Sequence, residues 1–173
     1  MPGWSPEIAN EFIRLAIGEG RLLNQVQLQG LTYVAHGRSL ALSGEPLTGD
    51  RPEAWDFGPV YRRLADVLRS HGLDIVDREI LTCEVYRQWA GPEAQMPASA
   101  QLNQDEMELI ANVYRDFAAL GEARLFHCMS ATGSAWAAVF AEGAGEFREI
   151  THNLIKAQFL QLSSEGGRWL QVK

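Results

Sequence analysis

The sequence predicts a mainly α-helical protein in which residues 1–173 form one compact domain. Two observations indicate this class: apolar residues recur at intervals of three and four along several segments, and helix start and stop signals bracket those segments. A chain of 173 residues is also long enough to bury roughly 70% of its unfolded surface in one core. We expect about seven helices, with at most a minor β contribution.

The first two helices are marked by their ends. Ser5 precedes a proline and is expected to cap a first helix that ends at Gly18. Asn24 and Gln27 have the spacing of a capping box, so a second helix should start there and end at Gly44. Both segments carry an apolar stripe, which indicates that each packs against a common core.

The second helix should be the central one. Apolar residues cover so much of its circumference that it needs neighbours on several sides. Gly30 and Gly37 lie seven residues apart, on nearly the same face of this helix. Because glycine has no side chain, we expect another helix to approach closely along that face.

A loop, or at most a short extended segment, that carries Trp55 should connect the second helix to the third. Residues 44–57 are rich in Gly, Asp and Pro, and Pro59, directly after Gly58, is expected at the first position of the third helix. Trp55 is expected to be a buried anchor between these two helices. On that interpretation Trp55→Ala would cost roughly 3–5 kcal/mol of stability.

The region from 73 to 100 carries the weakest signals. Residues 73–76 and 80–86 are apolar enough for short strands or for irregular packing, and the sequence leaves both open. Residues 91–100 contain two prolines and few apolar residues, which predicts a flexible loop.

Four more helices should follow this region. Asn103 and Glu106 have the spacing of a second capping box, Glu122 opens a short helix, and Ser134 can cap the next. A last helix should extend to Gly166. The residues expected to be buried on it are Ile150, Leu154, Ala157 and one of Phe159 or Leu162.

Charge and composition limit the kinds of partner. A net charge of −7 argues against extensive electrostatic binding of nucleic acid. Arg62, Arg63 and Arg69 would nevertheless form a small basic patch. Two distant cysteines without a CxxC pair suit the reducing cytosol. The sequence has neither a signal peptide nor an apolar run long enough to span a bilayer. We therefore expect a cytoplasmic protein that does not bind membranes.

Catalytic and metal-binding patterns are missing from the sequence. No two of the four histidines are spaced to share a metal on one helix face. The adjacent His127 and Cys128 would point to different faces of a helix, and a thiol among apolar residues is commonly inert. No phosphate-binding glycine loop or serine-nucleophile motif occurs. We expect neither enzyme activity nor a metal nor another cofactor.

Residues 28–61 carry a distinctive order of side chains. They match L-x-x-L-x-Y-x-x-x-G-x-x-L-x-x-x-G-x-P-L followed by an E-A-W-x-x-G-P-V-Y block. In this order the sequence resembles the Panacea family of SocA-like antitoxins and phage-associated proteins. A weaker match follows downstream, where residues 134–135 replace the small residue and proline of relatives. The matching motif residues include Tyr33, Gly37, Glu53, Trp55, Gly58, Pro59, Tyr61, His127 and Trp136.

The resemblance implies a function that needs no catalytic residue. Antitoxins of this family neutralise a toxin, usually encoded beside them, by binding it directly, and a SocA-like member acts as a proteolytic adaptor that delivers its toxin to a cytosolic protease. The expected partner is therefore a cognate toxin, with a cytosolic protease as a further candidate. Other relatives are phage or prophage proteins, so the alternative is a nucleic-acid-linked or regulatory role. An acidic domain also suits a basic toxin.

Two interpretations of the Trp-bearing loop remain open. In the first, the loop is a structural clamp in which Trp55 and Gly58 hold helices together and Glu53 caps a helix or pairs with an arginine. In the second, it belongs to a partner-binding face, because recognition tends to reside in loops held by a rigid scaffold. The partner-binding candidates are Asp50, Arg51, Asp56 and Arg62.

Overall fold

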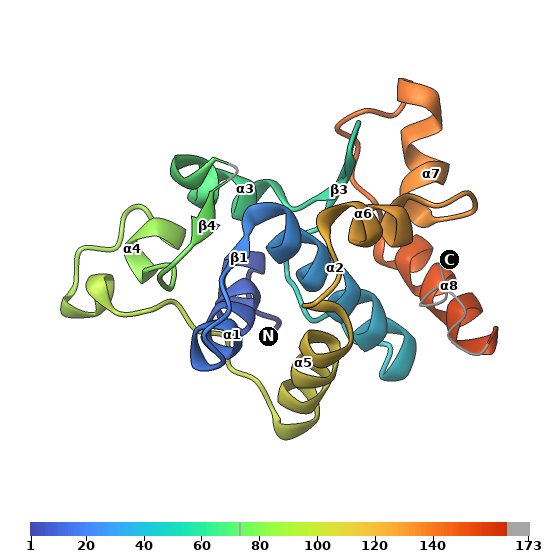
Figure 1. Ribbon diagram of the computed structural model, residues 1–173. Helices are drawn as coiled ribbons and strands as arrows, with labels where there is room; N and C mark the ends of the chain where they lie inside the picture. The colour runs from blue at the N-terminus through green and yellow to red at the C-terminus, as the bar shows by residue number, and fades with distance from the viewer. Residues whose placement is uncertain (73, 166–173) are drawn as a thin grey trace.

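The computed structural model describes residues 1–72 and 74–165, and helices dominate this part of the chain (Figure 1). The mainly α-helical fold class is confirmed, with eight α-helices among the described residues. The helices are α1 (Ser5–Gly18), α2 (Gln25–Leu42), α3 (Arg62–Leu68), α4 (Thr82–Val85), α5 (Gln104–Phe117), α6 (Glu122–Ser130), α7 (Ala135–Phe140) and α8 (His152–Ser164). No helix in the described ranges is long and apolar enough to cross a membrane.

Short strands and 3-10 helices complete the described structure. Strand β1 (Leu23–Asn24) pairs with β4 (Ile75–Val76), and β2 (Glu53–Trp55) pairs with β3 (Gly58–Val60), both antiparallel. The 3-10 helices are η1 (Arg69–His71), η2 (Pro92–Gln95) and η3 (Ala141–Gly143).

Helix α2 is the centre of the fold, as its all-round apolar character predicts. It packs against α8, α5, α1 and α6, which surround it in Figure 1. Its capping box forms as expected, because the Asn24 side chain accepts from the backbone N–H of Gln27 and the Gln27 side chain accepts from that of Asn24. Asn103 and Glu106 form the same reciprocal capping box at α5, whereas α7 has a simple cap in which the Ser134 hydroxyl accepts from the N–H of Ala137.

The two glycines of α2 admit two different neighbours rather than one. A Cβ on Gly37 would lie 2.2 Å from the ring of Phe159 on α8, whereas Gly30 faces Leu125 and Met129 of α6. The contact between Gly37 and Phe159 lies on the buried face of α8. Phe159 and Ile155 are buried there, while Leu154 and Ala157, which we expected inside, are exposed. The predicted end at Gly166 lies outside the described residues.

A β-hairpin occupies the segment that we expected to be a loop, or at most a short extended segment, followed by a helix start. Pro59 lies in β3 opposite Ala54, and α3 begins only at Arg62. Ala54 donates its N–H to the carbonyl of Arg148, and its own carbonyl accepts from the N–H of Phe147. Because Ala54 needs no hydrogen-bond donor from β3, a proline fits opposite it. Gly58 has φ 120°, a backbone angle that strongly favours glycine.

The segment from 74 to 100 is attached to α1 by a buried amide. The Asn10 side chain donates to the carbonyls of Ile80 and Ala98 at 2.8 and 2.7 Å, and accepts from the backbone N–H of Ile80 at 2.8 Å. Residues 75–76 form strand β4, whereas residues 80–86, for which a short strand or irregular packing was left open, contain the helical turn α4. The stretch 91–100, expected as a loop, contains η2 and a bridge between Leu81 and Pro97.

Candidate partner-binding face

Trp55 lies at the surface of the hairpin, within a group of aromatic rings. Its ring meets the rings of Phe57 and Phe147 edge to face, with centroids 5.7 and 5.5 Å away. Trp55 is only partly buried, and Phe57 and Phe147 are 54% and 53% exposed. Trp55 is therefore not the fully buried anchor that we expected, and its ring packs against Phe147, a residue distant in sequence. We call Trp55, Phe57 and Phe147 the aromatic cluster.

Glu53 connects the aromatic cluster to α3. One of its carboxylate oxygens accepts from the Trp55 indole N–H at 2.9 Å, and Arg62 donates to both oxygens at 2.9 Å. Burial acts to raise the pKa of Glu53, but the hydrogen bonds from Arg62 and Trp55 outweigh it and hold the pKa below its ordinary value. The guanidinium of Arg62 also lies 5.7 Å from the Trp55 ring centroid. The side chains around Trp55 are thus held in one arrangement.

Residues 147–150 form hydrogen bonds along the edge of strand β2 that does not face β3. Phe147 donates its N–H to the carbonyl of Ala54 at 2.7 Å, and Ile150 donates to the carbonyl of Pro52 at 2.8 Å. Phe147 has φ 65°, a left-handed angle that is unusual for a residue other than glycine. This backbone turn brings the Phe147 ring against Trp55, and sequence periodicity gives no signal for it.

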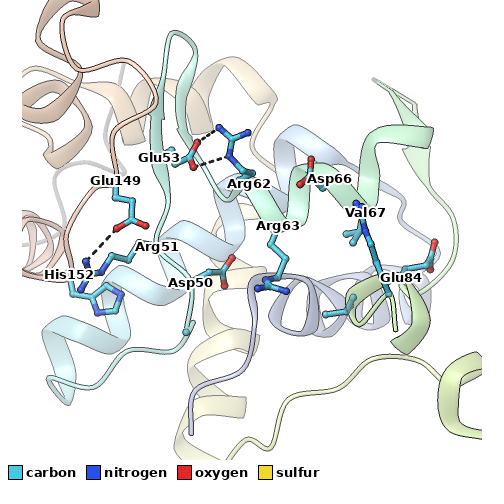
Figure 2. Close-up of a pocket in the computed structure, with 13 residues that line it drawn as sticks. Asp50, Arg51, Glu53, Arg62, Arg63, Asp66, Val67, Glu84, Glu149 and His152 are labelled. Carbon is cyan, nitrogen blue, oxygen red and sulfur yellow. Dashed lines mark hydrogen bonds and ion pairs between the residues drawn. The ribbon is translucent and has the colours of Figure 1, made fainter. Parts of the chain in front are cut away.

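A charged cleft of about 800 Å³ lies beside the hairpin, between α3, α4 and the start of α8 (Figure 2). Acidic and basic side chains both line it, and several are paired across it. Arg62 pairs with Glu53 at 2.9 Å, and Arg51 with Glu149 at 3.4 Å. The charged or titratable lining residues are Asp50, Arg51, Glu53, Arg62, Arg63, Asp66, Glu84, Arg87, Glu149 and His152.

The structure brings three of the four partner-binding candidates to this cleft. Arg51 and Arg62 are exposed there, and Asp50 lies deeper. Asp56 is exposed in the hairpin turn and lines neither the cleft nor the apolar groove described below.

The expected cap at Ser5 is wrong, because Ser5 donates its N–H and hydroxyl to the Asp50 carboxylate at 2.7 and 2.5 Å. Burial, opposed by these bonds, raises the pKa of Asp50.

An apolar groove of about 700 Å³ lies on the other side of α3. Helices α3 and α6 form its walls, and the start of α2 and strand β3 contribute the residues between them. We call this the apolar groove, lined by Gln25, Val26, Gln29, Trp55, Phe57, Pro59, Val60, Ala65, Asp66, Arg69, Glu122, Ala123, Phe126 and Met129. Trp55 and Phe57 of the aromatic cluster line part of it.

The remaining motif residues lie at different depths. Tyr33 and Tyr61 are fully buried, and burial raises the pKa of both phenols. The backbone N–H and carbonyl of Tyr61 bond to the Gln29 side chain at 2.8 and 3.0 Å. His127 is exposed on α6, and Trp136 of α7 stacks on Phe140.

The sequence did not single out His36, which is buried, or His152, which is partly buried, as a pair. His36 of α2 is fully buried, and its Nδ1 accepts from the backbone N–H of Thr48 at 3.2 Å. The ring of His152 lies 4.8 Å from it, centroid to centroid. Burial, and then His152, lower the pKa of His36 to about 3, so the ring is neutral at ordinary pH. Sequence spacing carries no signal for this pair, which the α2–α8 packing creates.

The described residues contain no group of three His, Cys, Asp or Glu side chains able to hold a metal ion. Cys128 is buried on α6, and burial raises the pKa of its thiol. A raised thiol pKa disfavours the thiolate, which is the nucleophilic form of cysteine.

Comparison with known proteins gives the family. A model of the family described as "Antitoxin SocA-like, Panacea domain" matches residues 28–137. Antitoxin SocA of Caulobacter vibrioides (strain NA1000 / CB15N) is 27% identical to this chain over 138 residues, which cover 80% of this chain and 70% of that relative. No solved structure matches the chain. The chain belongs to the SocA-like antitoxin family with a Panacea domain, which confirms the resemblance in the motif residues.

Family membership supports an antitoxin-type role and implies, in general terms, a toxin protein as partner. It also points to a role without catalysis. The match includes α2, the hairpin, α3 and α6, and therefore the elements that carry most of the apolar groove and part of the charged cleft.

Proposed function

We propose that this protein neutralises a cognate toxin by binding it directly, and that the aromatic cluster and the charged cleft form the binding face. The observation that carries the proposal is the half-exposed pair Phe57 and Phe147, whose rings both pack edge to face against Trp55. Aromatic residues and arginine are enriched at protein interfaces and among their hot spots, and a rigid aromatic ring buries a large area at low entropic cost. The adjoining cleft supplies the charged pairs typical of an interface rim.

The face is also largely preorganised. Glu53 holds Arg62 and the Trp55 indole, and the 147–150 segment holds the hairpin from its far edge. A surface that is already ordered loses less conformational entropy when a partner binds. The net charge of −7 would steer a basic toxin toward the protein and suppress encounters with acidic ones.

A nucleic-acid-linked role has less support from the arginines once considered for it. Arg62 pairs with Glu53 and Arg69 with Asp66, while the guanidinium of Arg63 lies 4.1 Å from the Trp4 ring centroid. Phosphate contacts would have to displace these interactions against a net negative protein. A protein partner needs no such rearrangement.

The test is growth rescue by the partner pair. The proposed toxin is the product of a gene adjacent to the one for this protein, expressed alone to establish that it stops growth. Co-expression of the wild-type protein should restore growth, and the double variant Phe57→Ala, Phe147→Ala should restore it poorly. Met107→Ala is the matched control, since Met107 is 52% exposed on α5, outside the face. Rescue by the double variant equal to that by wild type would contradict the proposed face.

The same strains separate neutralisation by binding from a proteolytic adaptor. Both mechanisms begin with the same complex. An adaptor also lowers the amount of toxin in the cell, and this loss disappears when the cytosolic protease is deleted. Simple neutralisation leaves the toxin level unchanged with and without the protease, and growth is restored in both cases.

A further inference from the structure

We propose that the apolar groove receives an amphipathic helix of the toxin, which places a row of apolar side chains in the groove and a Lys or Arg beside Glu122. This inference rests on the proposed function, because it names the part of the toxin that the protein recognises. It extends the binding face from the aromatic cluster across α3 to the wall formed by α6.

The lining of the groove favours an apolar occupant. Apolar side chains predominate, and they include Val26 on α2, Pro59 on β3 and Phe126 on α6. The groove has a volume of about 700 Å³, and Phe57 lines it while 54% exposed. Covering this surface would remove apolar area from water, which is the main favourable term in protein association.

The charges of the groove favour a basic residue on the occupant. Asp66, Arg69 and Glu122 are its charged lining residues, and Asp66 pairs with Arg69 at 2.6 Å. Glu122 accepts from the side-chain amide of Asn24, and in the described part of the chain no Lys or Arg forms an ion pair with it. The groove therefore retains one negative charge that a cation on the partner can match.

The backbone around the groove favours a helix over an added strand. An extended peptide would need donors and acceptors from the edge strand β3. Pro59 has no N–H, and the N–H and carbonyl of Tyr61 are already bonded to Gln29. A helix satisfies its own backbone groups and needs only apolar contacts from the groove. A second copy of this chain fits less well, because both copies carry a charge of −7.

The decisive variant places a charge in the groove wall without disturbing the core. Ala123 is exposed on α6 and lines the groove, so Ala123→Glu should fold normally while blocking an apolar occupant. Ala111→Glu is the matched control, because Ala111 is equally classed as exposed but lies on α5, outside the groove. Glu122→Lys reverses the charge that should meet the basic residue.

Binding is measured by titration calorimetry with the purified product of the adjacent gene, at low and at high salt. We expect Ala123→Glu to weaken binding about tenfold or more and Ala111→Glu to change it less than about twofold. Glu122→Lys should weaken binding more strongly at low salt than at high salt. Hydrogen exchange in the complex should show protection of the peptides that contain 53–60 and 122–130.

The outcomes separate this inference from the proposed function. If the wild-type protein binds and Ala123→Glu binds equally well, the groove is not the toxin site, while direct neutralisation stands. If the wild-type protein does not bind, both proposals are overturned. Self-association of the protein alone that Ala123→Glu abolishes would assign the groove to a second copy, and would also overturn the inference.

Discussion

The indole N–H of Trp136 donates a hydrogen bond to the backbone carbonyl of Trp55 at 2.7 Å. The two residues are 81 positions apart and belong to the two separate parts of the family motif. This bond ties α7 to the hairpin that carries the aromatic cluster. The two parts of the motif are therefore joined in space, at the base of the proposed binding face.

Trp136→Phe should destabilise the protein by about 1 kcal/mol. Phenylalanine can still pack near Phe140 but cannot donate a hydrogen bond, so the Trp55 carbonyl loses its donor. Urea unfolding measures the change. Trp89→Phe, at a half-exposed indole outside the hairpin, serves as control and should have little effect. Equal stability of Trp136→Phe and wild type would show that the bond contributes nothing to the hairpin's attachment.

Gly37→Ala should destabilise the protein by about 1–3 kcal/mol. The new methyl group would lie 2.2 Å from the Phe159 ring, so α2 and α8 must separate or Phe159 must leave its position. Gly18→Ala makes the same change near the end of α1, where nothing lies within 4 Å, and should be neutral or slightly stabilising. Thermal unfolding compares the two. If Gly37→Ala costs less stability when Phe159 is replaced by leucine, the clash with the Phe159 ring is confirmed as the cause.

Asn10→Ala should cost about 2–3 kcal/mol, because it removes three hydrogen bonds and leaves buried backbone groups of Ile80 and Ala98 without their partner. The segment between those residues should become easier to cleave by proteases than in wild type. Asn112→Ala, at an exposed position of α5, is the control. Unchanged cleavage of residues 81–97 would mean that Asn10 does not hold this segment.

The titration of His36 should make the folded protein less stable in acid. Its pKa is about 3 in the folded protein against an ordinary 6.5, so the unfolded chain binds a proton that the folded chain excludes. The penalty is absent above pH 6.5 and grows as the pH falls toward 3, by at most about 1.4 kcal/mol per pH unit. His36→Asn keeps an acceptor for the Thr48 N–H and does not titrate. Its unfolding free energy should depend less steeply on pH, and an unchanged slope would contradict this account.

The structure also lowers the expected cost of Trp55→Ala. A buried anchor would account for 3–5 kcal/mol, but the ring is partly exposed and packs against two half-exposed phenylalanines. We now expect a loss of about 2 kcal/mol in urea unfolding. A loss above 4 kcal/mol would restore the interpretation of Trp55 as a core residue.

Local signals predicted the helices well, and distant contacts explain where the predictions failed. The capping boxes at Asn24 and Asn103 depend on residues three positions apart, so sequence spacing reveals them. Ser5 looked equally like a cap, but Asp50 from another segment binds its hydroxyl. The sequence allowed at most a short extended segment in place of the hairpin, because its strands are three residues long and depend on residues 147–150 for support.

The candidate site was predicted in part for the same reason. Arg51 and Arg62 lie close in sequence to the conspicuous Trp55 block, so they could be proposed as candidates. Phe147 and Glu149 join the face only through a turn with φ 65° at Phe147. The apolar groove depends on α6 packing beside α3, and no motif spacing encodes that contact.

The most direct test of the account is the molar mass of the complex in solution. The purified protein is mixed with the purified product of the adjacent gene and analysed by size-exclusion chromatography with light scattering. We expect a single species of fixed stoichiometry that contains both chains and that Phe57→Ala with Phe147→Ala weakens. Separate elution of the two proteins, from a partner that still stops growth when expressed alone, would contradict neutralisation by direct binding.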